Sequence, residues 1–255
     1  MLKLVLYIYI FIIIGLMLMV FPVVWVYWVF SLTIVTYVSA FIVNKYREYG
    51  FAALVAFYTI YLAASQIVAT RLIEFDLGFY TFFAPAAVFL YPFLSQAIDM
   101  INEVYGKKKT HIAIIIAFVT QVLLVTFIVM TNSLNPAPFF EHEAAWQSIF
   151  TQGIRIILAS WISFLVFQNL DAYVFAWMKT HYPKQVFLRS ASSDLLSLTL
   201  DSLIFVVLAF YGVAPLGPLI IGQIVAKNLI GLLDTPWFVW YKRYLEKHAS
   251  INNNL

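Results

Sequence analysis

Seven ionisable side chains interrupt otherwise apolar stretches of this chain. They are Asp99, Glu103, Asp171, Asp194, Asp201, Lys227 and Asp234. A charged group costs about 2.5–3.5 kcal/mol at the centre of a membrane-spanning helix on insertion scales, so each one needs a partner, a proton or a ligand. Carboxylates accept hydrogen bonds and an ammonium group donates them. These positions are therefore the first candidates for a site that binds a polar solute.

Four of these groups fall at a similar predicted depth. The four are Asp99, Asp171, Asp201 and Lys227. At about 1.5 Å of rise per residue, they lie roughly 12–22 Å from the nearest basic residues that flank the same apolar stretches. Three acids and one base cannot cancel in a single ion pair. The surplus carboxylates must bind protons, face water or meet the hydrogen-bond donors of a ligand.

Helical spacing places further polar residues on the same faces. Pairs one or two turns apart are Asp99 with Asn102, Gln168 with Asp171, and Asp194 with Asp201. Residues three or four positions apart are neighbours on a helix surface. We interpret these stripes as the inner wall of a polar cavity.

Each acidic position also has a structural interpretation. Glu103 precedes Lys107 by four residues, which suits a surface ion pair. Asp194 can be a solvated helix end, and Asp234 can serve the backbone around a proline kink at Pro236. For the four groups of similar depth, the alternative is a buried network that clamps helices together.

The composition indicates that membrane-spanning helices position these charged groups. Of 255 residues, 64% are hydrophobic and 11% are charged, whereas soluble domains carry about 25% charged residues. The apolar residues form blocks of about 20, the length that crosses a hydrocarbon core of about 30 Å. We predict an all-α, polytopic transmembrane helix bundle of about eight spans. The predicted spans are residues 3–21, 23–43, 51–72, 79–103, 110–131, 152–178, 189–211 and 217–241.

Basic residues predict the orientation of the bundle. Lys and Arg collect in cytoplasmic loops near helix ends, and here they follow every second span, at Lys45, Lys107, Lys179 and Lys242. This alternation predicts an even number of spans with both termini in the cytoplasm. We divide the chain into an N-terminal hydrophobic hairpin (1–48), a six-helix core (49–246) and a polar C-terminal tail (247–255). One long kinked helix over residues 1–43 is the alternative to the hairpin.

Several classes of protein do not suit this sequence. The chain has no cysteine, which excludes disulfides and thiolate catalysis. It has neither a Gly-x-Ser-x-Gly elbow nor a Gly-rich filter of the kind found in channels. An intramembrane protease built on Asp99 and Asp171 and a channel remain as rival classes. We expect no enzyme, no cofactor and no metal site, because all four histidines fall in loops or tails: His111, His142, His181 and His248.

Four stretches carry a family resemblance, and they occur in the same order as in that family. They are YPFL at 91–94 with DMINEVYG at 99–106, Arg155 with QNLD at 168–171, DSLIF at 201–205 with AFYG at 209–212, and Lys227 with LLDTP at 232–236. Over roughly residues 55–245 the chain resembles the queuosine-precursor transporter family, also called the vitamin uptake transporter (VUT) family. The resemblance implies import of 7-deazaguanine bases such as preQ0 or preQ1 across the cytoplasmic membrane, for modification of tRNA.

A deazaguanine ligand suggests roles for the candidate residues. A carboxylate can accept hydrogen bonds from the ring N–H and the exocyclic amine as a bidentate pair. We expect Asp201 or Asp171 to do this, Lys227 to donate to the ring carbonyl, and an aromatic side chain to stack on the base. Trp161, Phe205 and Tyr173 are the candidates for stacking. The predicted substrate-binding residues are Asp99, Asn102, Gln168, Asp171, Asp194, Asp201, Lys227, Trp161 and Phe205.

The predicted partners are a nucleobase-like small molecule and the lipid bilayer, without nucleic acid; a homo-oligomer is left open. An alternative interpretation keeps the same ligand but assigns its transport to an ATP-driven system. The chain would then be the substrate-binding membrane subunit of an ATP-driven uptake system, whose ATPase would be a separate protein because no P-loop is present. We favour transport by this chain alone, because its first apolar block lacks the small-residue faces that allow close helix docking.

Overall fold

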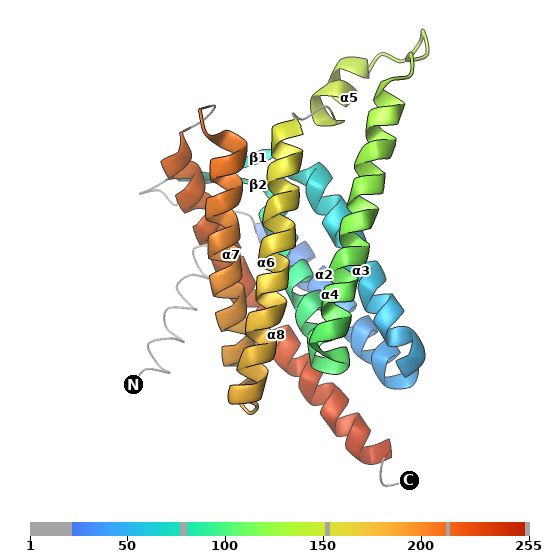
Figure 1. Cartoon of the computed structure of the whole chain (residues 1–255), viewed down its shortest axis with the longest axis vertical. Helices are drawn as coiled ribbons and strands as arrows, with labels where there is room; N and C mark the ends of the chain where they lie inside the picture. Colours follow the sequence, from blue (N-terminus) through green and yellow to red (C-terminus); the bar gives the residue numbers. More distant parts are fainter. Residues whose placement is uncertain (1–21, 77–80, 151–153, 213–214, 253–255) are drawn as a thin grey trace.

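Long helices dominate the structure. The computed structural model describes residues 22–76, 81–150, 154–212 and 215–252. Six helices within these residues are long and apolar enough to cross a membrane, and they pack side by side in Figure 1. The elements are α2 (Pro22–Lys45), α3 (Arg47–Val68), β1 (Leu72–Asp76), β2 (Thr81–Pro85), the 3-10 helix η1 (Ala86–Phe89), α4 (Tyr91–Asn132), α5 (Glu143–Phe150), α6 (Ile154–His181), α7 (Val186–Phe210) and α8 (Leu216–Asn252).

Helix α4 is broken in the middle. Its 42 residues would extend about 63 Å if straight, roughly twice the hydrocarbon thickness of a bilayer. Gly106, at φ 78° and ψ 167°, breaks the helix, and in Figure 1 the chain turns back at the lower end of α4. The two arms pack on each other, since Leu94 and Ile98 share a core cluster with Ile114 and Ala117.

The predicted number of spans is not confirmed. Among the described residues there are six membrane-length helices, and one of them, Ala86–Asn132 with its break, contains the predicted span 110–131 and most of the predicted span 79–103. The predicted span 3–21 lies outside the described residues. The other predicted spans correspond to α2, α3, α6, α7 and α8 with shifted ends. Membrane orientation and the division at residue 48 stay predictions.

A β-hairpin was missed by the prediction of helix over 51–72 and 79–103. Helix α3 ends at Val68, and β1 pairs antiparallel with β2 in the register Leu72↔Pro85. Phe75 and Phe82 stack at 4.8 Å between ring centroids. The hairpin backbone lies against α8, where a Cβ on Gly222 would come within 2.3 Å of the Phe83 carbonyl oxygen. The strand β2 falls inside the predicted span 79–103, and an apolar window cannot separate such a short strand from a helix.

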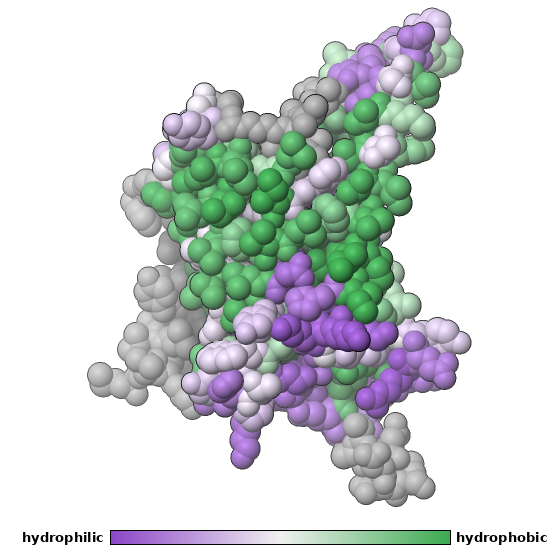
Figure 2. Space-filling view, viewed as in Figure 1, coloured by the Kyte–Doolittle hydropathy of each residue, from purple (hydrophilic) through white to green (hydrophobic). Residues whose placement is uncertain are grey.

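Apolar side chains face outward over much of the bundle. Ile115, Leu123 and Phe127 on the second arm of α4 are all more than half exposed, and Figure 2 shows green apolar residues covering most of the visible face. Polar residues gather toward its lower end. This distribution suits lipid around the middle of the bundle and water beyond its ends.

The lower end of the bundle is held together by one carboxylate. Glu103 of α4 forms ion pairs with Lys179 of α6 at 3.4 Å, Arg189 of α7 at 2.9 Å and Lys242 of α8 at 3.1 Å. We call these four residues the Glu103 cluster, and the end of the bundle where they lie the basic end. Arg189 is only 1% exposed. Four helices therefore depend on one acid at this end.

The expected pairing of Glu103 with Lys107 is wrong. The break at Gly106 directs Lys107 to α6, where its ammonium lies 4.0 Å from the centre of the Tyr173 ring. His111, expected in a loop, lies in the second arm of α4 and contacts the Asn169 side chain.

Replacing Gly106 tests the cost of the break in α4. A Cβ there would meet no atom within 4 Å, so Gly106→Ala should destabilise the protein only through its backbone conformation, by about 1–3 kcal/mol. Gly217→Ala is the matched control, because its Cβ also meets nothing and its φ is not positive. Denaturant unfolding in detergent measures both. Equal stability of the two variants would refute this role of Gly106.

Removing the acid of the Glu103 cluster tests its contribution to stability. Glu103→Gln leaves buried Arg189 without its anion, and breaking a buried pair in this way costs on the order of 3 kcal/mol. Glu246→Gln is the control, since the Glu246 side chain is 63% exposed and pairs with Lys242 at 3.5 Å; such surface pairs contribute about 0–1 kcal/mol. If both variants unfold at the same denaturant concentration, the cluster does not hold the helices together.

Candidate functional site

The predicted lysine and one predicted acid meet inside the bundle. The Lys227 ammonium on α8 forms a salt bridge with Asp201 on α7, and the lysine side chain is fully buried. Asp201 also accepts a hydrogen bond from the Ser163 hydroxyl on α6, at 2.6 Å. The ammonium lies 3.5 Å above the centre of the Tyr91 ring of α4, a cation–π contact that is strengthened by the absence of water. We call these four residues the lysine site.

A small cavity adjoins the lysine site. Its volume is about 20 Å³, enough for about one water molecule. Tyr91, Phe205, Gln223 and Lys227 are among the residues that line it. Lys227 thus has an aromatic ring, an amide and a carboxylate around it, and these are groups that can recognise a flat polar ring. A drug-sized ligand needs a pocket of about 300–1,000 Å³, so binding requires the helices around this cavity to separate.

Four other acids form a second cluster, with one acid from each of four helices. Asp99 of α4, Asp171 of α6, Asp194 of α7 and Asp234 of α8 are each at most 3% exposed, and Asp99 interacts electrostatically with the other three. We call them the acidic cluster. The structure thus separates the group expected at one depth: Asp201 and Lys227 pair, while Asp99 and Asp171 join Asp194 and Asp234. Asp194 is not a solvated helix end.

The acidic cluster is poor in hydrogen-bond donors. Ser190 donates to Asp99, and Ser197 donates to Asp171 at 3.1 Å. Among the residues that the structure describes, one carboxylate oxygen of each acid has no hydrogen-bond partner: Asp99 Oδ1, Asp171 Oδ2, Asp194 Oδ1 and Asp234 Oδ2. Within the described residues no Lys or Arg forms a salt bridge with any of them. Buried carboxylates in this state can bind protons or accept hydrogen bonds from a ligand.

Two predicted residues are used in contacts between helices. Asn102 donates to the Ala172 carbonyl at 2.9 Å, which joins α4 to α6. Gln168 accepts from the Tyr58 hydroxyl at 2.9 Å, which joins α6 to α3. Both residues lie within one turn of an acid of the cluster. Their amides therefore fix the helices that carry Asp99 and Asp171, and their role toward a substrate stays a prediction.

The aromatic candidates are placed differently from one another. Phe205 is 7% exposed and lines the cavity beside Lys227. Trp161 is not among the residues that line it and packs edge-on against Phe118 at 5.8 Å between centroids. Tyr173 is 54% exposed and holds Lys107, which contradicts its proposed stacking role. The sequence analysis missed Tyr91, although it stands in the YPFL stretch quoted above, and Ser163, for which the sequence offers no signal.

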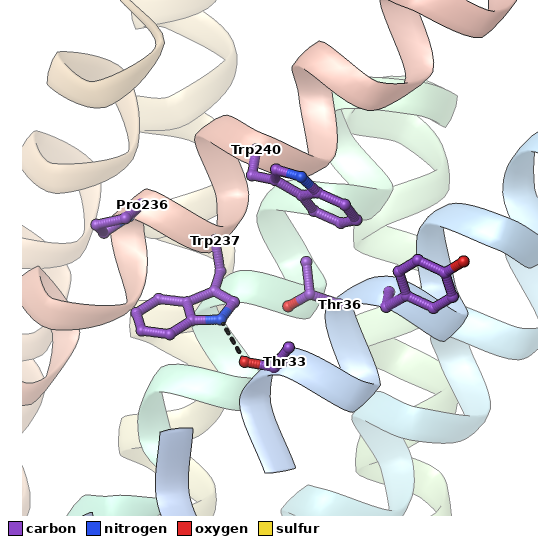
Figure 3. A pocket seen from close by; sticks show the side chains of 6 residues that line it. Thr33, Thr36, Pro236, Trp237 and Trp240 are labelled. Carbon is purple, nitrogen blue, oxygen red and sulfur yellow. Dashed lines mark hydrogen bonds between the residues drawn. The ribbon is translucent and has the colours of Figure 1, made fainter. Parts of the chain in front are cut away.

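A separate groove lies between α2 and α8. Its volume is about 300 Å³, and it is lined by Thr33, Thr36, Tyr37, Pro236, Trp237 and Trp240 (Figure 3). The Trp237 indole N–H donates to the Thr33 hydroxyl at 2.9 Å, so part of the polar lining is already satisfied. Tyr37 is 55% exposed and Trp240 is 40% exposed. None of the predicted site residues lines this groove, so we place the candidate site at Lys227 and the acidic cluster.

The chain is similar to known proteins over most of the described helices. Residues 85–241 match the model of a family described as putative vitamin uptake transporters, and this range contains the lysine site and the acidic cluster. The chain is also 29% identical over 154 residues to a "Probable queuosine precursor transporter" of Bacillus subtilis (strain 168), covering 58% of this chain and 67% of that protein. No solved structure matches the chain. The family match spans more than half of the chain, and six apolar helices accompany it: the protein belongs to the putative vitamin uptake transporter family and is a multi-pass membrane transporter.

Proposed function

We propose that this transporter imports 7-deazaguanine queuosine precursors, such as preQ0 or preQ1, across the cytoplasmic membrane for modification of tRNA. The printed name of the Bacillus subtilis relative supports this choice of substrate. The observation that carries the proposal is the acidic cluster, whose four buried acids each keep one oxygen without a hydrogen-bond donor. A ligand rich in N–H groups satisfies such a site, and a ligand that only accepts hydrogen bonds does not.

The chemistry of a deazaguanine base fits both groups of residues. Its ring N–H and exocyclic amine point the same way and match the two oxygens of one carboxylate. Of the two acids considered from sequence, Asp171 is the better candidate, because its Oδ2 is free. Both oxygens of Asp201 are already engaged, by Lys227 and by Ser163. Lys227 is the donor for the ring carbonyl, and Tyr91 and Phe205 supply aromatic faces beside it.

Transport by such a site requires the helices around it to move. The cavity of about 20 Å³ beside Lys227 is far smaller than a ligand pocket. Opening it breaks the contacts that now close it, including the Lys227–Asp201 pair, and the ligand can replace some of them. This exchange of protein contacts for ligand contacts lowers the cost of leaving buried charges unpaired. No catalytic step is part of the proposal.

Uptake measurements with variants of the lysine site test the proposal. Lys227→Ala should reduce uptake of a labelled 7-deazaguanine base by at least about tenfold, the effect of losing one charge-assisted hydrogen bond. Asp201→Asn should reduce uptake to a similar extent, because it removes the anion that pairs with Lys227. Lys184→Ala, at an exposed position, should transport normally. Wild-type uptake in both site variants would rule out the assignment of these residues.

A folding control accompanies these variants. A single substitution leaves a buried charge without its partner and can unfold the protein, whereas replacing both charges by apolar residues is often tolerated. The double variant Asp201→Leu with Lys227→Met should therefore remain folded in detergent and still fail to transport. A folded double variant with normal uptake contradicts the proposed role of the pair.

The second candidate is a substrate-binding subunit for a separate ATPase, and it makes a different prediction. We expect this polypeptide alone, reconstituted into liposomes without ATP, to equilibrate a labelled 7-deazaguanine base across the membrane. The ATP-driven alternative predicts binding of the base but no uptake until an ATPase partner and ATP are supplied. Liposomes with Lys227→Ala protein serve as the control for leakage.

A further inference from the structure

Two neighbouring cavities share part of their lining, one beside Lys227 and one beside α5. The inner cavity is the one beside Lys227, and an outer cavity of about 80 Å³ adjoins it. They share five lining residues: Gln66, Ala69, Pro85, Ser160 and Phe205. Because the same side chains form the wall between them, one rearrangement of this wall connects the outer cavity to Lys227.

The outer cavity leads to one end of the bundle. Ile149 and Phe150 of α5 line it, and Figure 1 shows α5 at the end opposite the tail of α8. The basic end is closed by contrast, since the Glu103 cluster joins α4, α6, α7 and α8 there. The structure therefore has two neighbouring cavities between the α5 end and Lys227, and a set of ion-paired helices at the other end.

The wall between the cavities has the chemistry of a nucleobase site. The Gln66 amide both donates and accepts hydrogen bonds, the Ser160 hydroxyl does the same, and Phe205 supplies an aromatic face. Within the described residues neither Gln66 nor Ser160 has a side-chain hydrogen-bond partner. Free polar groups beside an aromatic ring are the usual means of orienting a flat heteroaromatic ligand.

We propose that the substrate enters from the α5 end by this route and is held at an outer subsite, made by Gln66, Ser160 and Phe205, before it reaches Lys227. The proposal rests on the proposed function for the nature of the ligand, a flat heteroaromatic base with N–H donors. Phe205 separates the two cavities and also borders the one beside Lys227. Its movement lets the base pass from the outer subsite to the lysine site.

Cysteine labelling tests the route directly, because the chain contains no cysteine. Ser160→Cys, and Ala69→Cys as a second variant in case the first fails to fold, each place a thiol in the wall that both cavities share. A membrane-impermeant thiol reagent is applied without substrate, from each side of the membrane in turn. Ser133→Cys, exposed just beyond α4, reports the α5 end, and Ser39→Cys, 1% exposed, is the buried control.

The expected result is labelling of Ser160→Cys from the side that labels Ser133→Cys, at least tenfold faster than labelling of Ser39→Cys. A saturating 7-deazaguanine base should slow that labelling at least threefold. If a Ser160→Cys or Ala69→Cys protein that transports reacts no faster than Ser39→Cys, or reacts from the opposite side, the route is wrong. If the protein transports the base but the base gives no protection, the outer subsite is wrong.

These outcomes differ from a failure of the proposed function. Labelling without substrate depends only on access to the thiol. It therefore tests the route even in a protein that does not transport 7-deazaguanine bases. Absence of uptake and of protection together, with rapid labelling of Ser160→Cys, refutes the substrate and the outer subsite and leaves the route supported.

Discussion

A charged group that is shielded from water inside a lipid-embedded bundle must be neutralised, and this constraint organises the protein. Lys227 satisfies it through Asp201 and the Tyr91 ring. Glu103 satisfies it through three cations at the basic end. The acidic cluster satisfies it only in part, because serine hydroxyls reach some of its oxygens and four oxygens have no partner. The ion pairs of Glu103 join four helices at the basic end, and the incompletely paired acids are positions where we propose that a ligand binds.

The sequence predicted which polar residues are buried, but it did not predict which of them lie together in the folded protein. Rise along a helix gives depth, and on that basis Asp99, Asp171, Asp201 and Lys227 were placed at one level. Depth carries no information about which neighbour a helix face meets. Only the packing of the helices shows that Lys227 pairs with Asp201 and that Asp99 lies in the same cluster as Asp194.

The misjudged elements have similar physical causes. Hydropathy finds helices α6, α7 and α8 because their apolar blocks match the thickness of a bilayer. It does not register the hairpin, because β2 (TFFAP) lies inside the predicted span 79–103, while β1 (LIEFD) falls almost wholly between two predicted spans. Hydropathy places a turn between the predicted spans 79–103 and 110–131, where Gly106 breaks α4, but it does not show that Lys107 then contacts Tyr173 instead of Glu103. The family resemblance was confirmed by the match of residues 85–241 to the family model.

The central claim is that buried carboxylates with free oxygens bind the N–H donors of the substrate. The most direct measurement is the affinity of the purified protein for 7-deazaguanine and for 7-deazahypoxanthine, which lacks the exocyclic amine. Loss of a hydrogen bond to a charged group costs about 1.5–3 kcal/mol, so we predict that the second base binds at least about tenfold more weakly. Equal affinity for the two bases, or binding of neither, would contradict the account.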